Sequence, residues 1–148
     1  MSDTDEITEL LTTFFSAFVS GDDISSEMTA LRAALLPNAV IVKTCGSTVS
    51  YTVDEFIAPR EAILTDGTLT DFREWPSSGR LDIFGDIAQW FGSYRKSGAQ
   101  GGAAFTGAGM KSVQFVRTSD GWRISAAIWD DERPTVSLNE YTEKTWPA

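Results

Sequence analysis

The stretch GWRISAAIWDDE, from Gly121 to Glu132, places two tryptophans around a short apolar run that stops at three consecutive acids. Asp120-Gly121 is a favoured two-residue hairpin turn, so the stretch is expected to be a strand paired antiparallel with the segment before it. Side chains alternate between the two faces of a strand. One face then carries Trp122, Ile124, Ala126 and Ile128, and the other carries Arg123, Ser125, Ala127 and Trp129. The stretch therefore predicts a final strand with one face on a core and the other on a cavity or a second subunit.

The predicted sheet extends upstream of this strand. Runs rich in β-branched and aromatic residues, bounded by turn residues, cover positions 68–83, 86–96, 110–118 and 122–130. Gly85-Asp86 marks a tight reversal between the first two runs. Ser97–Gly109 contains five glycines, which leaves little side chain to pack, so it is predicted to be a mobile loop joining two long strands.

Helical periodicity dominates the beginning of the chain. Apolar side chains recur at spacings of three and four and form one stripe: Ile7, Leu10, Leu11, Phe14, Phe15 and Phe18. Ser2 or Thr4 is expected to cap this helix, and Gly21 to break it. A second stripe predicts another helix, which stops at Leu36-Pro37-Asn38 and buries Ile24, Met28, Leu31 and Leu35. The two helices are predicted to form a hairpin.

A short hairpin and a third helix are predicted next. The β-branched run Ala39–Val42 and the piece from Val49 to Tyr51 indicate a small edge hairpin. Thr52-Val53-Asp54-Glu55 has the form of a capping box, in which the Thr hydroxyl and the Glu carboxylate both accept from backbone N–H groups at a helix start. This helix is expected to kink just before Pro59 and to stop at Gly67.

Length and charge exclude several classes of function. The 148 residues suit one domain, spanning positions 1–148, that buries a core of ordinary size. A net charge of -9 argues against a groove for nucleic acid, and no run of about 18 apolar residues is present to insert into a membrane. The N-terminus is acidic where a secretory signal would be basic and then apolar, which predicts a cytoplasmic protein.

The chain contains no histidine. This excludes a Ser-His-Asp triad, a Cys-His pair and an HExxH zinc site, and neither a cofactor nor a metal site is predicted. Proton transfer near neutral pH must then use a carboxylic acid with a raised pKa, a tyrosine, a lysine or bound water. Cys45 is the single cysteine and has no imidazole to generate its thiolate, so a nucleophilic role is not expected.

Three helices followed by a run of antiparallel strands indicate an α+β fold with the helices on one face of a curved sheet. Six segments carry a resemblance to known proteins: the helical hairpin, the strand Asn38–Val42, the helix Phe56–Leu64, and then FGDIAQWFGSY (84–94), MKSVQFVR (110–117) and GWRISAAIW (121–129). In this order they resemble the nuclear transport factor 2-like superfamily, the cone-shaped fold shared by ketosteroid isomerase, scytalone dehydratase and small polyketide cyclases, and its bacterial members in particular. The resemblance covers nearly the whole chain.

The resemblance implies a cone-shaped fold of three N-terminal helices packed on a strongly curved antiparallel sheet. It also implies a homodimer and a cone interior that holds a small apolar or aromatic molecule. Steroid isomerases of the superfamily use a tyrosine from the first helix, where this chain has Phe14, Phe15 and Phe18, and the dehydratase and cyclases rely on histidine. Their mechanisms therefore do not carry over.

Several residues are predicted to line the cone interior. Asp130 follows the final strand, and if it points into an apolar cone, desolvation raises its pKa and makes it an acid–base candidate. The default for the three acids in this stretch is a solvated chain end. The predicted ligand pocket contains Phe18, Tyr51, Arg60, Trp75, Trp90, Gln114 and Trp129. Core packing, a subunit interface, a structural hydrogen bond or a surface ion pair is the alternative for each of these residues.

Two hypotheses about function follow. The first is an isomerase- or cyclase-type enzyme that uses carboxylate proton transfer in an apolar pocket. The second is a non-catalytic module for ligand binding or dimerisation. The sequence leaves open which face of the sheet forms the dimer.

Overall fold

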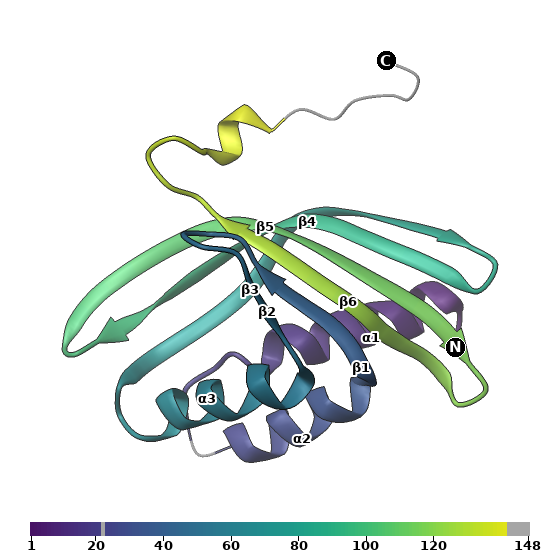
Figure 1. Ribbon diagram of the computed structural model, residues 1–148, viewed down its shortest axis with the longest axis horizontal. Helices are drawn as coiled ribbons and strands as arrows, with labels where there is room; N and C mark the ends of the chain where they lie inside the picture. Colours follow the sequence, from purple (N-terminus) through teal and green to yellow (C-terminus); the bar gives the residue numbers. More distant parts are fainter. Residues whose placement is uncertain (22, 142–148) are drawn as a thin grey trace.

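The computed structural model describes residues 1–21 and 23–141, so positions 22 and 142–148 of the predicted domain lie outside the described residues. The helices are α1 (Asp3–Ser16), α2 (Ile24–Ala34) and α3 (Val53–Thr65). The strands are β1 (Leu35–Lys43), β2 (Val49–Tyr51), β3 (Leu69–Phe84), β4 (Ile87–Gln100), β5 (Ala103–Thr118) and β6 (Gly121–Asp131), followed by a short 3-10 helix, η1 (Leu138–Glu140). Figure 1 shows the three helices gathered under one face of a curved sheet and η1 on the opposite side. The predicted α+β arrangement is confirmed, and the helix-covered face is called the inner face below.

The described strands form one sheet in the order β2-β1-β6-β5-β4-β3. Every neighbouring pair is antiparallel except β1 and β6, which run parallel, with Val40 opposite Ala126 and Val42 opposite Ile128. The expectation of a purely antiparallel sheet is wrong at this one pairing. β1 and β6 lie far apart in the sequence, so no hairpin turn determines their relative direction.

Both predicted helix caps are present. The Ser2 hydroxyl accepts from the Asp5 N–H at 3.1 Å, and the Asp5 carboxylate accepts from the Ser2 N–H at 3.3 Å. Thr52 and Glu55 make the same reciprocal pair at 3.2 and 2.9 Å, and α3 continues past Pro59. These bonds satisfy backbone donors that a helix start otherwise leaves free. Among the described residues, no helix is both long enough and apolar enough to cross a membrane.

Ser97–Gly109 is not a loop. β4 continues to Gln100 and β5 begins at Ala103, so a two-residue turn at Gly101 and Gly102 closes a long hairpin. Both turn glycines have positive φ, 58° and 83°, which L side chains rarely adopt. The loop prediction followed from the scarcity of side chains. Strand pairing depends on backbone hydrogen bonds, which glycine and alanine can make like other residues.

Two other predicted boundaries shift slightly. α2 ends earlier than expected, at Ala34, and Leu35 is already the first residue of β1. The final hairpin turns at residues 119–120, because Thr118 and Gly121 already pair as strand residues. The predicted reversal at Gly85-Asp86 lies where expected, between β3 and β4.

A β-bulge in β6 decides which of its side chains face the helices. Opposite β5, Ile124 pairs with Phe115 and Ala126 pairs with Gln114, so Ser125 is an extra residue without a partner. An extra residue shifts the alternation of every later side chain by one. The buried side chains of the strand are accordingly Trp122, Ile124, Ala127 and Trp129. The two tryptophans, predicted on opposite faces, both lie on the inner face.

The core fills the space between the inner face and the helices. Its largest fully buried side chains include Phe14, Phe56, Tyr94, Phe115 and Trp122. Trp90 lies over the paired glycines Gly79 and Gly92, where a side chain would overlap the indole ring. Aromatic rings dominate the burial, as expected for a small domain with nine Phe and five Trp.

Candidate functional site

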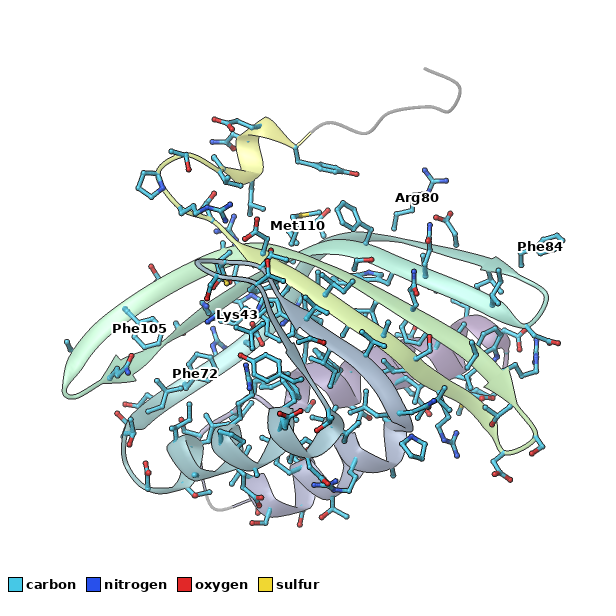
Figure 2. All side chains as sticks on the ribbon, in the orientation of Figure 1. Lys43, Phe72, Arg80, Phe84, Phe105 and Met110 are labelled. Carbon is cyan, nitrogen blue, oxygen red and sulfur yellow. The ribbon has the colours of Figure 1, made fainter. Side chains whose placement is uncertain are left out.

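A partly open cavity of about 160 Å³ lies between α3 and the inner face of the sheet. Its lining consists of Phe18, Lys43, Phe56, Arg60, Ile63, Leu64, Leu69, Phe72, Glu74, Lys96, Lys111, Trp129 and Asp131. In Figure 2, the labelled Lys43 and Phe72 lie on the helix side of the sheet, whereas Met110 and Arg80 lie on the outer side. A cavity of roughly 150 Å³ can hold a benzene ring. The volume therefore suits a ligand of about one ring.

Lys111 brings a charge into the core. Its side chain is 3% exposed, and its Nζ lies 3.4 Å from Oε1 of Glu74, whose side chain is 9% exposed. The ammonium also lies 4.4 Å from the ring centre of Tyr94 and 4.9 Å from that of Trp129, within cation–π range. Burial lowers the pKa of Lys111, and the neighbouring Glu74 carboxylate opposes this shift without reversing it. The pair places a titratable amine and a carboxylate in the cavity wall.

Asp131 enters the cavity from the end of β6. Tyr94 donates a hydrogen bond to its Oδ1, and Lys96 Nζ and Cys45 Sγ each lie 3.2 Å from its Oδ2. Burial acts to raise the pKa of Asp131, but the Tyr94 hydrogen bond and the Lys96 charge outweigh it and the pKa is lowered. Burial and the adjacent carboxylate raise the pKa of the Tyr94 phenol. Near neutral pH the network therefore contains an ionised acid and a protonated phenol.

Gly109 makes this contact possible. It lies opposite Tyr94 in the β4–β5 ladder, and a side chain at this position would overlap the Tyr94 hydroxyl. A glycine inside a strand often marks such a close approach. The glycine-rich hairpin thus helps to position the phenol against Asp131.

Two further cations line the cavity at partly exposed positions. The Arg60 guanidinium lies 4.1 Å from the ring centre of Phe56, 5.1 Å from that of Tyr51 and 5.7 Å from that of Trp129. One of its N–H groups donates to the Phe56 carbonyl at 3.1 Å. Lys43 is the last residue of β1 and lies opposite Trp129 in the parallel ladder. Lys43 and Arg60 therefore both come from positions next to Trp129.

The structure brings several predicted pocket residues together. Phe18, Arg60 and Trp129 line the cavity, and Tyr51 lies next to it beneath the Arg60 guanidinium. Trp90 belongs to the core, where its ring meets a phenylalanine of α1 edge to face at 6.0 Å. Trp90 therefore lies in the core, outside the set of residues that line the cavity.

Gln114 and Trp75 lie away from this cavity. Gln114 is exposed on the outer face, opposite Gln89 and Ala126 of the neighbouring strands. Trp75 is not among the residues that line the cavity, and the Arg73 guanidinium lies 4.3 Å from its ring centre. Neither residue therefore contributes to the lining of this cavity.

Asp130 does not point into the cone. Its carboxylate pairs with Arg133 at 2.5 Å on the outer side of the sheet. The inward orientation required for its acid–base role is absent, and its neighbour Asp131 is the acid that lines the cavity. The cause is the bulge at Ser125, which moves the inward position from 130 to 131.

Some site residues were not singled out from the sequence. Lys111 shares one strand face with the buried Val113 and Phe115. This spacing of two could have indicated from the sequence that the lysine faces the core. Glu74 likewise shares a strand face with Phe72. Asp131 had no comparable signal, because the bulge that turns it inward depends on the pairing of β5 with β6.

This arrangement offers proton donors and acceptors around one small space. Lys111 and Tyr94 can donate, and Glu74 and Asp131 can accept. Among residues 1–21 and 23–141, no three acidic or cysteine side chains are grouped as metal ligands. Groups of this kind can orient a polar ligand or transfer a proton to or from it.

Comparisons with known proteins connect the chain through structure only. No family model and no curated protein matches the sequence. A nuclear transport factor 2-like superfamily protein from Salmonella enterica superimposes with a TM-score of 0.73 at 12% identity, over 94% of this chain and 97% of that one. A nuclear transport factor 2-like protein with a cystatin-like fold from Novosphingobium aromaticivorans has a TM-score of 0.69 at 17% identity, over 93% and 85% of the two chains.

An enzyme is also among the similar structures. The hexachlorocyclohexane dehydrochlorinase LinA-type3 from Novosphingobium barchaimii has a TM-score of 0.68 at 12% identity, over 88% of this chain and 86% of that one. At these identities the likeness concerns the fold, and it extends over most of both chains.

Proposed function

Since this chain has the cone-shaped fold of nuclear transport factor 2-like proteins, we propose that it binds a small molecule with an apolar body in the cone and moves a proton on it. One observation carries the proposal: the Asp131 carboxylate and the buried Lys111 ammonium line the same ring-sized cavity. Apolar walls with a few convergent polar groups are typical of small-molecule sites. The reaction class that suits these groups is an isomerisation or cyclisation through proton transfer.

Asp131 is the proposed base, in the place first assigned to Asp130. Its lowered pKa keeps it ionised near neutral pH, and a carboxylate with three donors still has room for a fourth hydrogen bond. Lys111 is the proposed stabiliser of negative charge that develops on a ligand oxygen as the proton leaves. The aromatic walls, which include Phe18 and Trp129, lower the local dielectric constant and so strengthen both interactions.

One of the similar structures supports catalysis on this fold, because it is that of a dehydrochlorinase. Fold likeness alone does not determine a reaction, since one fold can host unrelated functions. Proton transfer is therefore supported by the residues of this cavity and not by the fold.

Ligand binding without catalysis is the second candidate function. Every buried side-chain nitrogen and oxygen among the described residues has a hydrogen-bond partner, as in a purely structural network. The donors around Asp131 also make it a weaker base. A non-catalytic cone would bind the same ligands and leave them unchanged.

Hydrogen–deuterium exchange tests the two candidates. Cyclohexanone and 4-oxopentanoate are incubated with the protein in D2O, and loss of the C–H signal beside the carbonyl is followed by proton NMR. We expect the wild-type protein to accelerate exchange, Asp131→Asn to abolish the acceleration, and Asp130→Asn to retain it. Asp130→Asn is the matched control, since it makes the same chemical change one residue away on the outer side of the sheet.

The outcomes separate the hypotheses. Binding of either probe without exchange supports the non-catalytic module. Exchange that survives in Asp131→Asn rejects that residue as the base, and the absence of both binding and exchange rejects the cone as a site for such molecules.

We also propose that residues 1–148 form one domain and that two copies pair through the outer face of the sheet. That face exposes Ile87, Phe91 and Ile128, from β4 and β6, although an exposed apolar patch is costly in a monomer. Tyr141 covers part of Phe91, with the ring centres 5.7 Å apart. The remaining apolar surface lies on the side away from the cavity opening, so pairing would leave the cone accessible.

A further inference from the structure

The cavity is richer in positive than in negative groups, although the chain carries a net charge of -9. Its charged lining consists of the cations Lys43, Arg60, Lys96 and Lys111 and the acids Glu74 and Asp131. Both acids are already paired inside the protein, Glu74 with Lys111 at 3.4 Å and Asp131 with Lys96 at 3.2 Å. Lys43 and Arg60 are the cations left over.

Neither of these two cations forms an ion pair with any residue that the structure describes. Arg60 uses one N–H on the Phe56 carbonyl, and the guanidinium has five N–H donors. Lys43 makes no side-chain hydrogen bond within the described chain. In a protein with 21 acidic residues, two cavity-lining cations without a carboxylate partner are available to a ligand.

Lys43 and Arg60 line the same cavity from two elements, Lys43 from β1 and Arg60 from α3. Lys43 ends β1 and lies opposite Trp129 in the ladder, and Arg60 comes from α3 with its guanidinium 5.7 Å from the centre of the Trp129 ring. Stacking on Phe56 at 4.1 Å holds the Arg60 guanidinium over an aromatic surface and reduces the freedom it would lose on binding. Both cations therefore line the cavity from partly exposed positions next to the same aromatic residue.

We propose that Lys43 and Arg60 bind the anionic group of the ligand, so that the cone is a site for a small carboxylate with an apolar ring or short chain. This inference rests on the proposed binding of a small molecule in the cone, and it adds the chemical class of that molecule. The guanidinium fork matches a carboxylate in two parallel hydrogen bonds, and the ammonium adds a second charge. The ring or chain then lies against Phe18 and Trp129.

Matched acids and neutral amides test the proposal. Benzoate, benzamide and inorganic phosphate are titrated into the wild-type protein by isothermal calorimetry, with the Trp129 indole followed by NMR. We expect benzoate to bind at least about tenfold more tightly than benzamide, and phosphate to bind more weakly than benzoate because it has no apolar body. Benzoate affinity is expected to fall as NaCl rises from about 0.05 to 0.5 M, while benzamide affinity stays constant.

Single substitutions test whether Lys43 and Arg60 bind the anionic group. Lys43→Met and Arg60→Gln should each weaken benzoate binding about tenfold and change benzamide binding less than about twofold. Arg32→Gln, an exposed change on α2 with the same loss of charge, should leave both affinities unaltered. The salt titration needs only the wild-type protein, so the proposal can be tested even if a variant fails to fold.

Three results would overturn the inference. Benzamide could bind as tightly as benzoate, phosphate could match benzoate, or both variants could retain the wild-type benzoate affinity. In the first of these cases the proposed small-molecule site survives and only the ligand class is wrong. If neither benzoate nor benzamide binds at about 10 mM, the proposed site in the cone fails as well.

Discussion

The two faces of the sheet differ in which side chains they bury and which they expose. On the inner face, Lys111 is buried and Asp131 is half-buried, and each is joined to a group of opposite charge. On the outer face, Phe84 and Ile87 leave 83% and 60% of their surface exposed. The inner face thus buries charges, and the outer face exposes hydrocarbon.

This contrast follows from the cost of burial. An ion withdrawn from water needs a partner in the same low-dielectric space, so the inner face carries its charges as pairs. An exposed apolar patch needs only a second surface to cover it. The inner face is therefore suited to a small polar ligand and the outer face to a protein surface.

The largest expected effect comes from breaking an inner pair. Lys111→Met leaves the Glu74 carboxylate buried without its cation, and we expect the free energy of unfolding to fall by about 3–5 kcal/mol. Urea unfolding followed by tryptophan fluorescence measures the loss. Adding Glu74→Leu should restore most of it, because the unpaired charge is then gone.

Arg95→Met provides the control for that experiment, because Arg95 is exposed and its replacement should change stability by less than about 0.5 kcal/mol. Equal losses for Lys111→Met and Arg95→Met would contradict the importance of the buried pair.

A smaller effect distinguishes the adjacent acids. Asp131→Asn should lower the free energy of unfolding by about 1–3 kcal/mol near neutral pH, because the buried Tyr94 hydroxyl and the half-buried Lys96 ammonium lose their anionic acceptor. Asp130→Asn removes only a surface pair and should lower it by about 0–1 kcal/mol. The difference between the wild type and Asp131→Asn should also depend on pH. The folded-state pKa of Asp131 is lowered, so its stabilisation is complete above the unfolded pKa of about 3.9 and disappears as pH falls through the folded pKa.

Urea unfolding at several pH values between about 7 and 2 would show this loss. A gap between the wild type and Asp131→Asn that stays constant down to the lowest pH would show that the carboxylate charge contributes nothing.

The smallest effect on the stability of one subunit is expected on the outer face. Ile128→Asp should turn a dimer into a monomer in sedimentation velocity experiments, because it places a charge in the centre of the proposed interface. Val49→Asp, an exposed position on the edge strand β2 and outside this patch, should leave the dimer intact. A wild-type protein that sediments as a monomer at all concentrations would exclude the proposed pairing.

Much of the fold could be predicted because it depends on neighbours along the chain. The stripe from Ile7 to Phe18 predicts α1, and the capping boxes at Ser2 and Thr52 set two helix starts. The order of helices before long strands indicates the α+β class. The glycine-rich segment was the main local error, since its backbone pairs across the hairpin despite its small side chains.

The candidate site was less predictable because it joins distant positions. Lys111 and Glu74 are 37 residues apart, as are Tyr94 and Asp131, and no local spacing reveals either pair. Three residues of the predicted pocket, Phe18, Arg60 and Trp129, line the cavity. That pocket was implied by the resemblance to a cone-shaped fold and not by any local spacing.

The sequence by itself determined the helices, their place before the long strands, and the class of chemistry left open by the absence of histidine. Only the tertiary structure decided that Asp131 and not Asp130 enters the cone, that β1 runs parallel to β6, and that Lys43 and Arg60 have no acidic partner among the described residues. The physical reason is that strand register and charge pairing arise between segments far apart in the chain. A single extra residue at Ser125 is enough to exchange the two faces of everything that follows it.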